Sequence, residues 1–354
     1  MAEQGAAAEA MVQEGRGARP REPRARREGA LYAALSILTV LVVLASLSLG
    51  EGTLADVRLR STLLILRASR LCAALLVGAA LAVAGVVVQG LFRNPLADPS
   101  VIGTTAGASL GGSTAMLLTE LVLAHGKIYD VSPDVALPLG CLAGAMVSLA
   151  LVLLLSRRSA DILSLILSGF LLSSVFVSLG SLITSMSQER WELGRALVAF
   201  SFGGLAGTGP RNVGVAAPLV VIGCAAAWFW AKPLDLLLSG DDEAASLGVD
   251  VARVRRYCVL WVAVLTAGAV SLGGNVGFVG LLVPHALRPL LGVEHRRLVP
   301  MAALGGALFV ASCDLVVRVL PARGSVPLGV VTGLIGAPAF LAVLARSQRE
   351  KRGD

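Results

Sequence analysis

The sequence predicts an all-α membrane protein that crosses the bilayer many times. The chain has 354 residues, of which 56% are hydrophobic and only 15% are charged, and its mean hydropathy is +0.80. Soluble domains usually carry about 25% charged residues. Uncharged apolar runs of about 20 residues, the length that crosses the hydrocarbon as a helix, recur along the chain between short polar segments. These observations together indicate a polytopic helical fold.

Ten apolar runs are candidate membrane spans. They lie at 30–50, 62–92, 99–119, 135–155, 162–187, 213–231, 257–276, 277–289, 298–320 and 324–345. A shorter apolar piece at 196–209 cannot cross the bilayer, so it is expected to be a half-helix or re-entrant segment packed on protein. The predicted domain organisation is a basic, disordered tail over 1–29, a transmembrane domain over 30–346 and a short tail over 347–354.

The distribution of positive charge places both termini in the cytoplasm. Ten spans put the two termini on one side, and two thirds of the Lys and Arg residues then lie in the tails and inner loops. This bias follows the positive-inside rule and explains the net charge of +7 without a nucleic-acid-binding face. The first run is about 20 residues long and lacks a small-residue cleavage site, so we expect an uncleaved first span.

The second and third spans are separated by the segment RNPLADPSVIG at 93–103. Its two prolines end the second span, because proline cannot continue a helix interior and restricts the residue before it. The third span then carries Gly103, Gly107 and Gly111 on one stripe. Small residues four apart let membrane helices approach closely, which indicates tight packing but does not identify a function. The last span repeats this spacing with Gly329, Gly333 and Ala337.

Three later spans depart from plain apolar sequence. The fifth span, 162–187, is rich in serines, which can bond to carbonyls of their own helix. The glycines of SLGGNVGFVG at 271–280 are expected to turn the chain between the seventh and eighth spans. In the ninth span, Asp314 and Arg318 share one helical face and are expected to form a local ion pair.

The sequence lacks the motifs of the main enzyme classes. It contains no G-x-x-x-x-G-K-[ST] phosphate loop, no H-E-x-x-H motif and no G-x-S-x-G elbow with a paired histidine. Its five cysteines form no C-x-x-C pair, and its three histidines are too few for a dedicated metal site. We therefore expect no catalytic residues, no cofactor and no resident metal. An intramembrane enzyme is the remote alternative.

Four stretches resemble one family of transport proteins. They are RNPLADPSVIGTTAGA at 93–108, SGDDEAASLGV at 239–249, GFVGLLVPHALRPLLGVEHRRLVP at 277–300 and VPLGVVTGLIGAPAFLAVL at 326–344. Over residues 30 to 346 the chain is similar to the FecCD-type permease subunits of bacterial ABC importers for iron-siderophores, haem and vitamin B12. Asn275 departs from the family pattern, in which a small or apolar residue is expected in this turn.

The resemblance implies a type II importer in the bacterial inner membrane. Such an importer has ten spans per subunit, two permease subunits around a central path, two ATPase subunits at the cytoplasmic face and a substrate-binding protein at the outer face. The cargo implied is an iron chelate, either a ferric siderophore or haem, with vitamin B12 as the alternative. His285 is a candidate ligand for iron or haem, but at the bent eighth span it is rather expected to cap or pack.

The longest polar inner loop, 237–256, is expected to contain a short helix. Ser239 or Asp241 can cap its start, Gly248 suits a left-handed exit, and Asp250 can cap the next helix. The residues alone would indicate a solvated loop helix, whereas the resemblance implies a pair of coupling helices that seat in a groove of the ATPase. The candidate coupling residues are Gly240, Asp241, Asp242, Glu243, Ala244, Leu247 and Gly248.

Two further groups of residues lie toward the outer face. Arg67, Arg70 and Arg318 stand at the outer ends of spans, where arginines can serve as plain anchors that reach the membrane surface. The resemblance implies instead that they pair with glutamates on the binding protein. It also implies that the fifth span lines the path and that the turn after it forms an outer constriction. The candidate gate residues are Ser181, Ser185, Met186 and Ser187.

Overall fold

The computed structural model describes residues 24–49, 57–124, 132–155, 162–320 and 326–352, and within these residues the regular structure is entirely helical. The helices are α2 (Arg24–Ser48), α3 (Val57–Leu91), the 3-10 helix η1 (Pro99–Ile102), α4 (Thr104–Ala124), α5 (Pro133–Leu155), α6 (Ile162–Met186), α7 (Trp191–Phe202), α8 (Pro210–Phe229), α9 (Ala231–Leu237), α10 (Asp241–Ser246), α11 (Val251–Gly273), α12 (Val279–Leu291), α13 (His295–Val319) and α14 (Leu328–Arg352).

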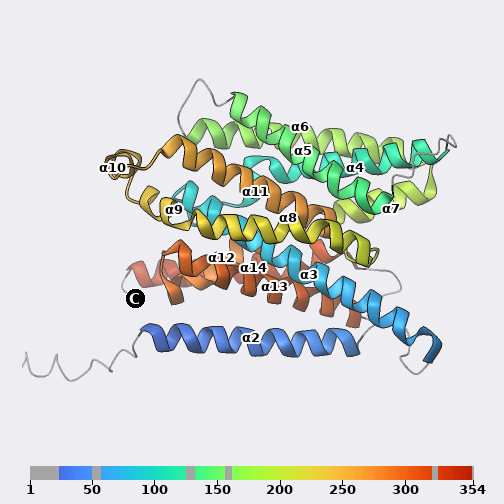
Figure 1. Ribbon diagram of the computed structural model, residues 1–354, viewed down its shortest axis with the longest axis horizontal. Coiled ribbons are helices and arrows are strands. Elements are labelled where there is room, and N and C mark those ends of the chain that lie inside the picture. The colour runs from blue at the N-terminus through green and yellow to red at the C-terminus, as the bar shows by residue number, and fades with distance from the viewer. Residues whose placement is uncertain (1–23, 50–56, 125–131, 156–161, 321–325, 353–354) are drawn as a thin grey trace, which may run out of the picture.

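The long helices run side by side in one elongated bundle, with α2 along one edge and α6 at the other (Figure 1). The start of α2, the carboxyl end of α14 and the short helix α10 all lie at the same end of the bundle (Figure 1). Both described chain ends therefore lie at one face, as an even number of crossings requires. We call this face the inner end and the opposite face the outer end.

Helix α3 is the central element of the bundle. It has 35 residues, about 52 Å of helix, which exceeds the hydrocarbon thickness of about 30 Å. Its most apolar stretch is 78% buried, and it packs against α13, α11, α12 and α8. The side chains that make this possible are small, since alanine and valine predominate among its fully buried residues. The core is therefore built around α3.

Glycines bring several helices into backbone contact. A Cβ atom placed on Gly111 of α4 would lie 2.1 Å from the carbonyl oxygen of Gly140 in α5, and one on Gly107 would lie 2.7 Å from that of Gly144. The glycine stripe of the third span thus packs tightly, as expected. In α14 the same spacing is used only in part. Gly329 meets the backbone of Phe202, whereas Gly333 has only the ring of Phe278 within 4 Å.

Seven helices are long and apolar enough to cross a membrane, namely α2, α3, α5, α6, α8, α11 and α13. Among the described residues, α4, α12 and α14 occupy the other three predicted spans, but α12 has only 13 residues and only the first part of α14 is apolar. The all-helical membrane fold is confirmed, and the number ten stays a prediction.

The structure differs from the predicted boundaries at several places. The third span does not begin at 99: η1 and Gly103, whose φ is +88°, separate its start from α4, because Asp98 caps η1 by accepting a hydrogen bond from the Ser100 amide. The half-helix is α7, Trp191–Phe202, which starts before 196, and residues 203–209 form no regular helix.

The expected tails are also partly helical. Helix α2 begins at Arg24 and α14 continues to Arg352, so both helices extend into segments predicted to be tails. The remaining parts of those tails, 1–23 and 353–354, lie outside the described residues.

The predicted turn between the seventh and eighth spans is present, between Gly273 and Val279. The amide of Asn275 donates a hydrogen bond to the carbonyl of Phe200 in α7, and its side chain is exposed. A polar residue is tolerated at this position because only its backbone packs against the neighbouring helix.

Candidate functional site

The inner loop forms two short helices, α9 and α10, at the inner end (Figure 1). Gly240, with a φ of +131°, is the N-cap of α10 and no side chain caps this helix, so the expected capping by Ser239 or Asp241 is wrong. Gly248 does take the left-handed exit, with a φ of +84°. Asp250 caps α11 as expected, since its carboxylate accepts a hydrogen bond of 2.9 Å from the Arg253 amide.

The carboxylate of Asp241 holds α10 in place instead of capping it. One oxygen forms an ion pair with Arg93, two residues after the end of α3. The other oxygen lies 2.5 Å from a guanidinium nitrogen of Arg255 in α11. The segment that separates the second and third spans thus contacts the predicted coupling helix. Neither arginine was expected to have this role, because the sequence does not reveal which distant carboxylate each one meets.

The surface of α10 divides the predicted coupling residues into two groups. Ala244 is fully buried against the core, so its side chain is not part of the exposed surface. Asp242, Glu243 and Leu247 point away from the bundle, and Leu247 is 65% exposed. These three side chains form an exposed surface of acidic and apolar groups at the inner end.

A second contact joins the inner loop to α13. Both the backbone amide and the ring nitrogen Nδ1 of His295, the first residue of α13, approach Asp235 Oδ1 of α9, at 2.9 and 2.6 Å. The His295 side chain is only 1% exposed. Sequence reasoning missed this pair, because the two residues are 60 positions apart.

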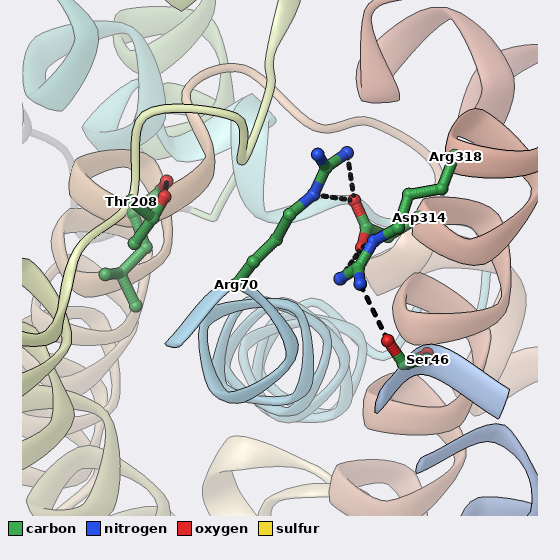
Figure 2. Close-up of polar contacts among 6 residues, drawn as sticks. Ser46, Arg70, Thr208, Asp314 and Arg318 are labelled. Atoms are coloured by element: carbon green, nitrogen blue, oxygen red, sulfur yellow. Dashed lines mark hydrogen bonds and ion pairs between the residues drawn. The ribbon is translucent and has the colours of Figure 1, made fainter. Parts of the chain in front are cut away.

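At the outer end, Asp314 of α13 lies between two arginines from different helices (Figure 2). Arg70 of α3 donates from Nε to Oδ1 at 2.9 Å, and Arg318 donates from Nε to Oδ2 at 2.8 Å. The expected local pair of Asp314 and Arg318 is present, and Arg70 extends it to a cluster of three. One carboxylate shared by two guanidinium groups leaves an excess positive charge at this site.

The three outer arginines differ in accessibility. Arg318 is 4% exposed and also donates to the carbonyl of Ser46 in α2 (Figure 2). Arg67 is 7% exposed and donates to the carbonyls of Leu47 and Ser48, the last residues of α2. Arg70 is 21% exposed. Two of the predicted docking residues therefore hold the end of α2, and Arg70 offers the most accessible guanidinium.

A cavity of about 630 Å³ opens beside this cluster. Arg70 and Arg318 form part of its wall, and Thr208 and Asn212 contribute polar groups from the α7–α8 connection and the start of α8. Thr208 lies across from Arg70 in Figure 2, and its hydroxyl donates to the carbonyl of Leu272. The cavity gives the positive charge of Arg70 a recess that an acidic group can enter.

The predicted gate residues lie at the outer end of α6. Ser181, Ser185 and Met186 are exposed, and Met186 is 75% exposed. Ser187 is buried and its hydroxyl donates to the carbonyl of Ile183 at 2.7 Å. Several other hydroxyls of this span also bond to carbonyls of their own helix, as the alternative interpretation of its serines expected.

His285 packs against the last helix, α14. Its ring meets that of Phe340 of α14 edge-on, with 5.5 Å between the ring centroids. No group of three or more potential metal ligands is found in the described part of the chain. The expectation that His285 packs at the eighth span is confirmed.

Comparisons with known proteins agree with this architecture. Residues 31–346 match the FecCD transport family. Relatives include the Fe(3+) dicitrate permease FecD of Escherichia coli (38% identity over 79% of this chain and 84% of that protein) and the hemin permease HmuU of Yersinia pestis (33%, 90% and 96%). Another is the cobalamin permease BtuC of Halobacterium salinarum (36%, 79% and 72%).

A solved structure supports the same assignment. An inward-facing metal-chelate type ABC transporter superposes with a TM-score of 0.78 at 30% sequence identity, covering 90% of this chain and 99% of that one. Fold, motifs and relatives coincide over nearly the whole transmembrane region. The chain therefore belongs to the FecCD transport family and is a multi-pass membrane permease of the ABC transporter class.

Proposed function

We propose that this chain is the membrane subunit of an ATP-driven importer that carries an iron chelate, a ferric siderophore or haem, across the inner membrane. The observation that carries the proposal is the placement of two different polar surfaces at opposite ends of one bundle. Exposed Asp242 and Glu243 of α10, with Leu247 directly after it, lie at the inner end, and Arg70 with its cavity lies at the outer end.

Each surface suits a different partner. At the inner end, two ATPase subunits would seat α10 in a groove, and hydrolysis would take place in those subunits because this chain has no phosphate loop. At the outer end, a substrate-binding protein would place acidic side chains beside Arg70. Arg67 and Arg318 would contribute positive charge to this docking site while remaining bonded to α2.

Two copies of the chain would form the transport path. Helix α6 exposes large apolar residues along most of its length, and only 11% of its most apolar stretch is buried, so it has surface available for a second copy. The path would be gated at the outer end of α6 by Ser181, Ser185 and Met186. Small hydroxyls and a flexible thioether suit a path that binds its cargo weakly and therefore releases it.

The relatives divide between iron chelates and vitamin B12, and the similar solved structure is of a metal-chelate type transporter. The iron(III) dicitrate and hemin permeases among them support an iron chelate, and the cobalamin permeases support vitamin B12 as the alternative. Reconstitution of the chain in proteoliposomes, with its ATPase and binding protein, tests the proposal. We expect ATP-dependent uptake of a ferric chelate or haem, and no ATP hydrolysis by the purified chain alone. Uptake of cobalamin only would favour the alternative, and uptake of none of the three would contradict the proposal.

A further inference from the structure

Three helices meet around the buried side chain of His295. Its Nδ1 and backbone amide both contact Asp235 of α9. A Cβ atom on Gly90 of α3 would lie 2.3 Å from Nε2 of the same ring, so the ring rests directly on the α3 backbone. One residue at the start of α13 thus connects α13 to both α3 and α9.

A second anchor ties the end of α3 to the inner loop. Arg93 lies two residues after the end of α3 and forms its ion pair with Asp241 at the start of α10. The inner ends of α3 and α13 therefore each hold one of the two short helices, α3 holding α10 and α13 holding α9. Because α9 and α10 also contact each other, they cannot shift without moving these two ends.

Helices α3 and α13 also contact each other directly at two further positions. At mid-length, a Cβ atom on Gly78 of α3 would lie 2.0 Å from the carbonyl oxygen of Gly306 in α13, so the two backbones touch. At the outer end, Arg70 of α3 bonds to Asp314 of α13. As many residues separate Gly78 from Arg70 as separate Gly306 from Asp314, so the antiparallel register is kept from the middle of the pair to its outer end.

We infer that α3 and α13 form a rigid strut that carries displacement of the α9–α10 unit to the outer arginine cluster, and that Arg93, Asp235 and His295 are the positioning residues at its inner end. This inference rests on the proposed function, in which an ATPase moves α10. Because backbone contacts and ion pairs hold the two helices together, a shift at His295 moves the pair as one rigid body. Asp314, about 29 Å further along α13, moves with it. The arginine cluster would then change its presentation to the binding protein.

The test loosens the inner anchors in the assembled transporter. The double variant combines Arg93→Gln, which removes the charge, with Asp235→Asn, which keeps side-chain size. The asparagine can still accept a hydrogen bond from the His295 amide. We expect basal ATP hydrolysis and complex assembly to be unchanged, while the stimulation of hydrolysis by the binding protein falls about tenfold, within the range of allosteric couplings. The matched control Arg253→Gln breaks the exposed pair with Asp250 inside the first turn of α11 and should leave stimulation unaltered.

Distances between spin labels provide a second measurement. The nucleotide-dependent change in these distances would be unaffected if Arg93 and Asp235 had only a structural role. One label is placed at Leu320, after α13, and another at Ser239, in the loop before α10, each measured between the two copies in a cysteine-free background. In the parent complex both distances should change with nucleotide state, and in the double variant only the Ser239 distance should. Equal changes at Leu320 in both proteins would overturn the strut, as would a parent complex with no change at Leu320.

Two outcomes separate this inference from the proposed function. If the parent complex shows no stimulation by the binding protein, the proposed function fails, and the label distances still decide the strut. If the double variant does not assemble, Asp235→Asn alone takes its place, because it disturbs only the contact with His295. That variant should lower both stimulation and the Leu320 change, and no reduction in either would overturn the strut.

Discussion

At the scale of single residues, the three outer arginines show that one residue type can have different roles at neighbouring positions. Arg67 donates hydrogen bonds to the end of α2, and Arg318 donates to the end of α2 and to Asp314. Arg70, in contrast, also lines the cavity. A buried charge is costly to separate from its partners, so Arg67 and Arg318 are held in place, whereas the partly exposed Arg70 can meet a second molecule. Docking strength should therefore depend mainly on Arg70.

Reversal of this one charge tests that conclusion. Arg70→Glu places a second carboxylate beside Asp314 and opposite the acidic groups expected on the binding protein. We expect the dissociation constant for the binding protein to rise at least tenfold, and wild-type docking to weaken as salt is raised, because exposed charge pairs are screened. Surface plasmon resonance on the reconstituted permease measures both. Arg60→Glu, an exposed arginine on the same helix, is the control, and an equal loss there would point to a general charge effect.

Residue contacts were predictable where they are local in sequence. The Asp250 cap, the Gly248 exit and the pairing of Asp314 with Arg318 all follow from spacings of four residues or fewer. The contact of Arg93 with Asp241 spans 148 positions and depends on how α3 packs, so no sequence pattern announces it. The same holds for the second partner of Asp314, Arg70, which comes from another helix.

At the scale of elements, α10 is a short helix with an exposed side that suits the ATPase contact proposed above. With six residues it is too short to be stable alone, and it is held by Asp241 and by the burial of Ala244. Its remaining side chains contribute little to the bundle. They are free to form a contact surface, which is the property that a coupling helix requires.

Substitutions on the exposed side of α10 should separate coupling from folding. Glu243→Lys with Leu247→Arg reverses the charge and removes the apolar residue of this surface without touching a buried side chain. We expect the permease to keep its melting temperature while ATP-dependent uptake falls to background. Thermal unfolding and uptake in proteoliposomes measure the two effects. Normal assembly and transport by this variant would show that α10 is not the coupling element.

Substitution at the contact of α4 with α5 should, in contrast, lower the stability of the protein. A methyl group on Gly111 would meet the carbonyl oxygen of Gly140 at 2.1 Å, so the two backbones would have to separate. We expect Gly111→Ala to destabilise the protein by about 1–3 kcal/mol, as overpacking of a close contact does. Gly180→Ala, in α6, is the control because nothing lies within 4 Å of its added methyl. Equal melting temperatures for the two variants would contradict the prediction.

Element types were predictable because a membrane leaves few alternatives, but element ends were not. Long apolar sequence in a bilayer must be helical, so the presence of the spans followed from composition. The start of α4 depends on Asp98 capping η1, and the end of α7 depends on the packing of residues 203–209 against the end of α11. Such ends are set by neighbouring elements, which hydropathy does not describe.

At the scale of the whole molecule, one chain accounts for only half of the proposed path. Helices α2 and α6 at the two edges of the bundle are both largely unburied (Figure 1). Lipid can cover either edge, since their exposed side chains are apolar. Helix α6 exposes more hydroxyl groups than α2, so we propose that its edge faces the second copy.

Cysteine crosslinking distinguishes these two edges. Cysteines introduced singly at Ser181 or Ser185, in a background without the five native cysteines, should form disulfides between two copies in one nucleotide state and not in another. Nonreducing electrophoresis of the reconstituted transporter measures the yield. A cysteine at Val40 on α2 should give no dimer in either state. Dimers at Val40 without dimers on α6 would show that the two copies meet along α2, which would contradict our proposal.

Glycine on both sides of the α4–α5 contact also bears on the order in which the chain assembles in the bilayer. Fixing a long side chain costs up to about 2 kcal/mol of rotamer entropy, and glycine has none to lose. Lipid supplies no hydrophobic drive toward helix association, so the pair with the smallest ordering penalty gains most from van der Waals contact alone. Helices α4 and α5 should therefore associate early during insertion, and offer a preformed surface to the helices that arrive later.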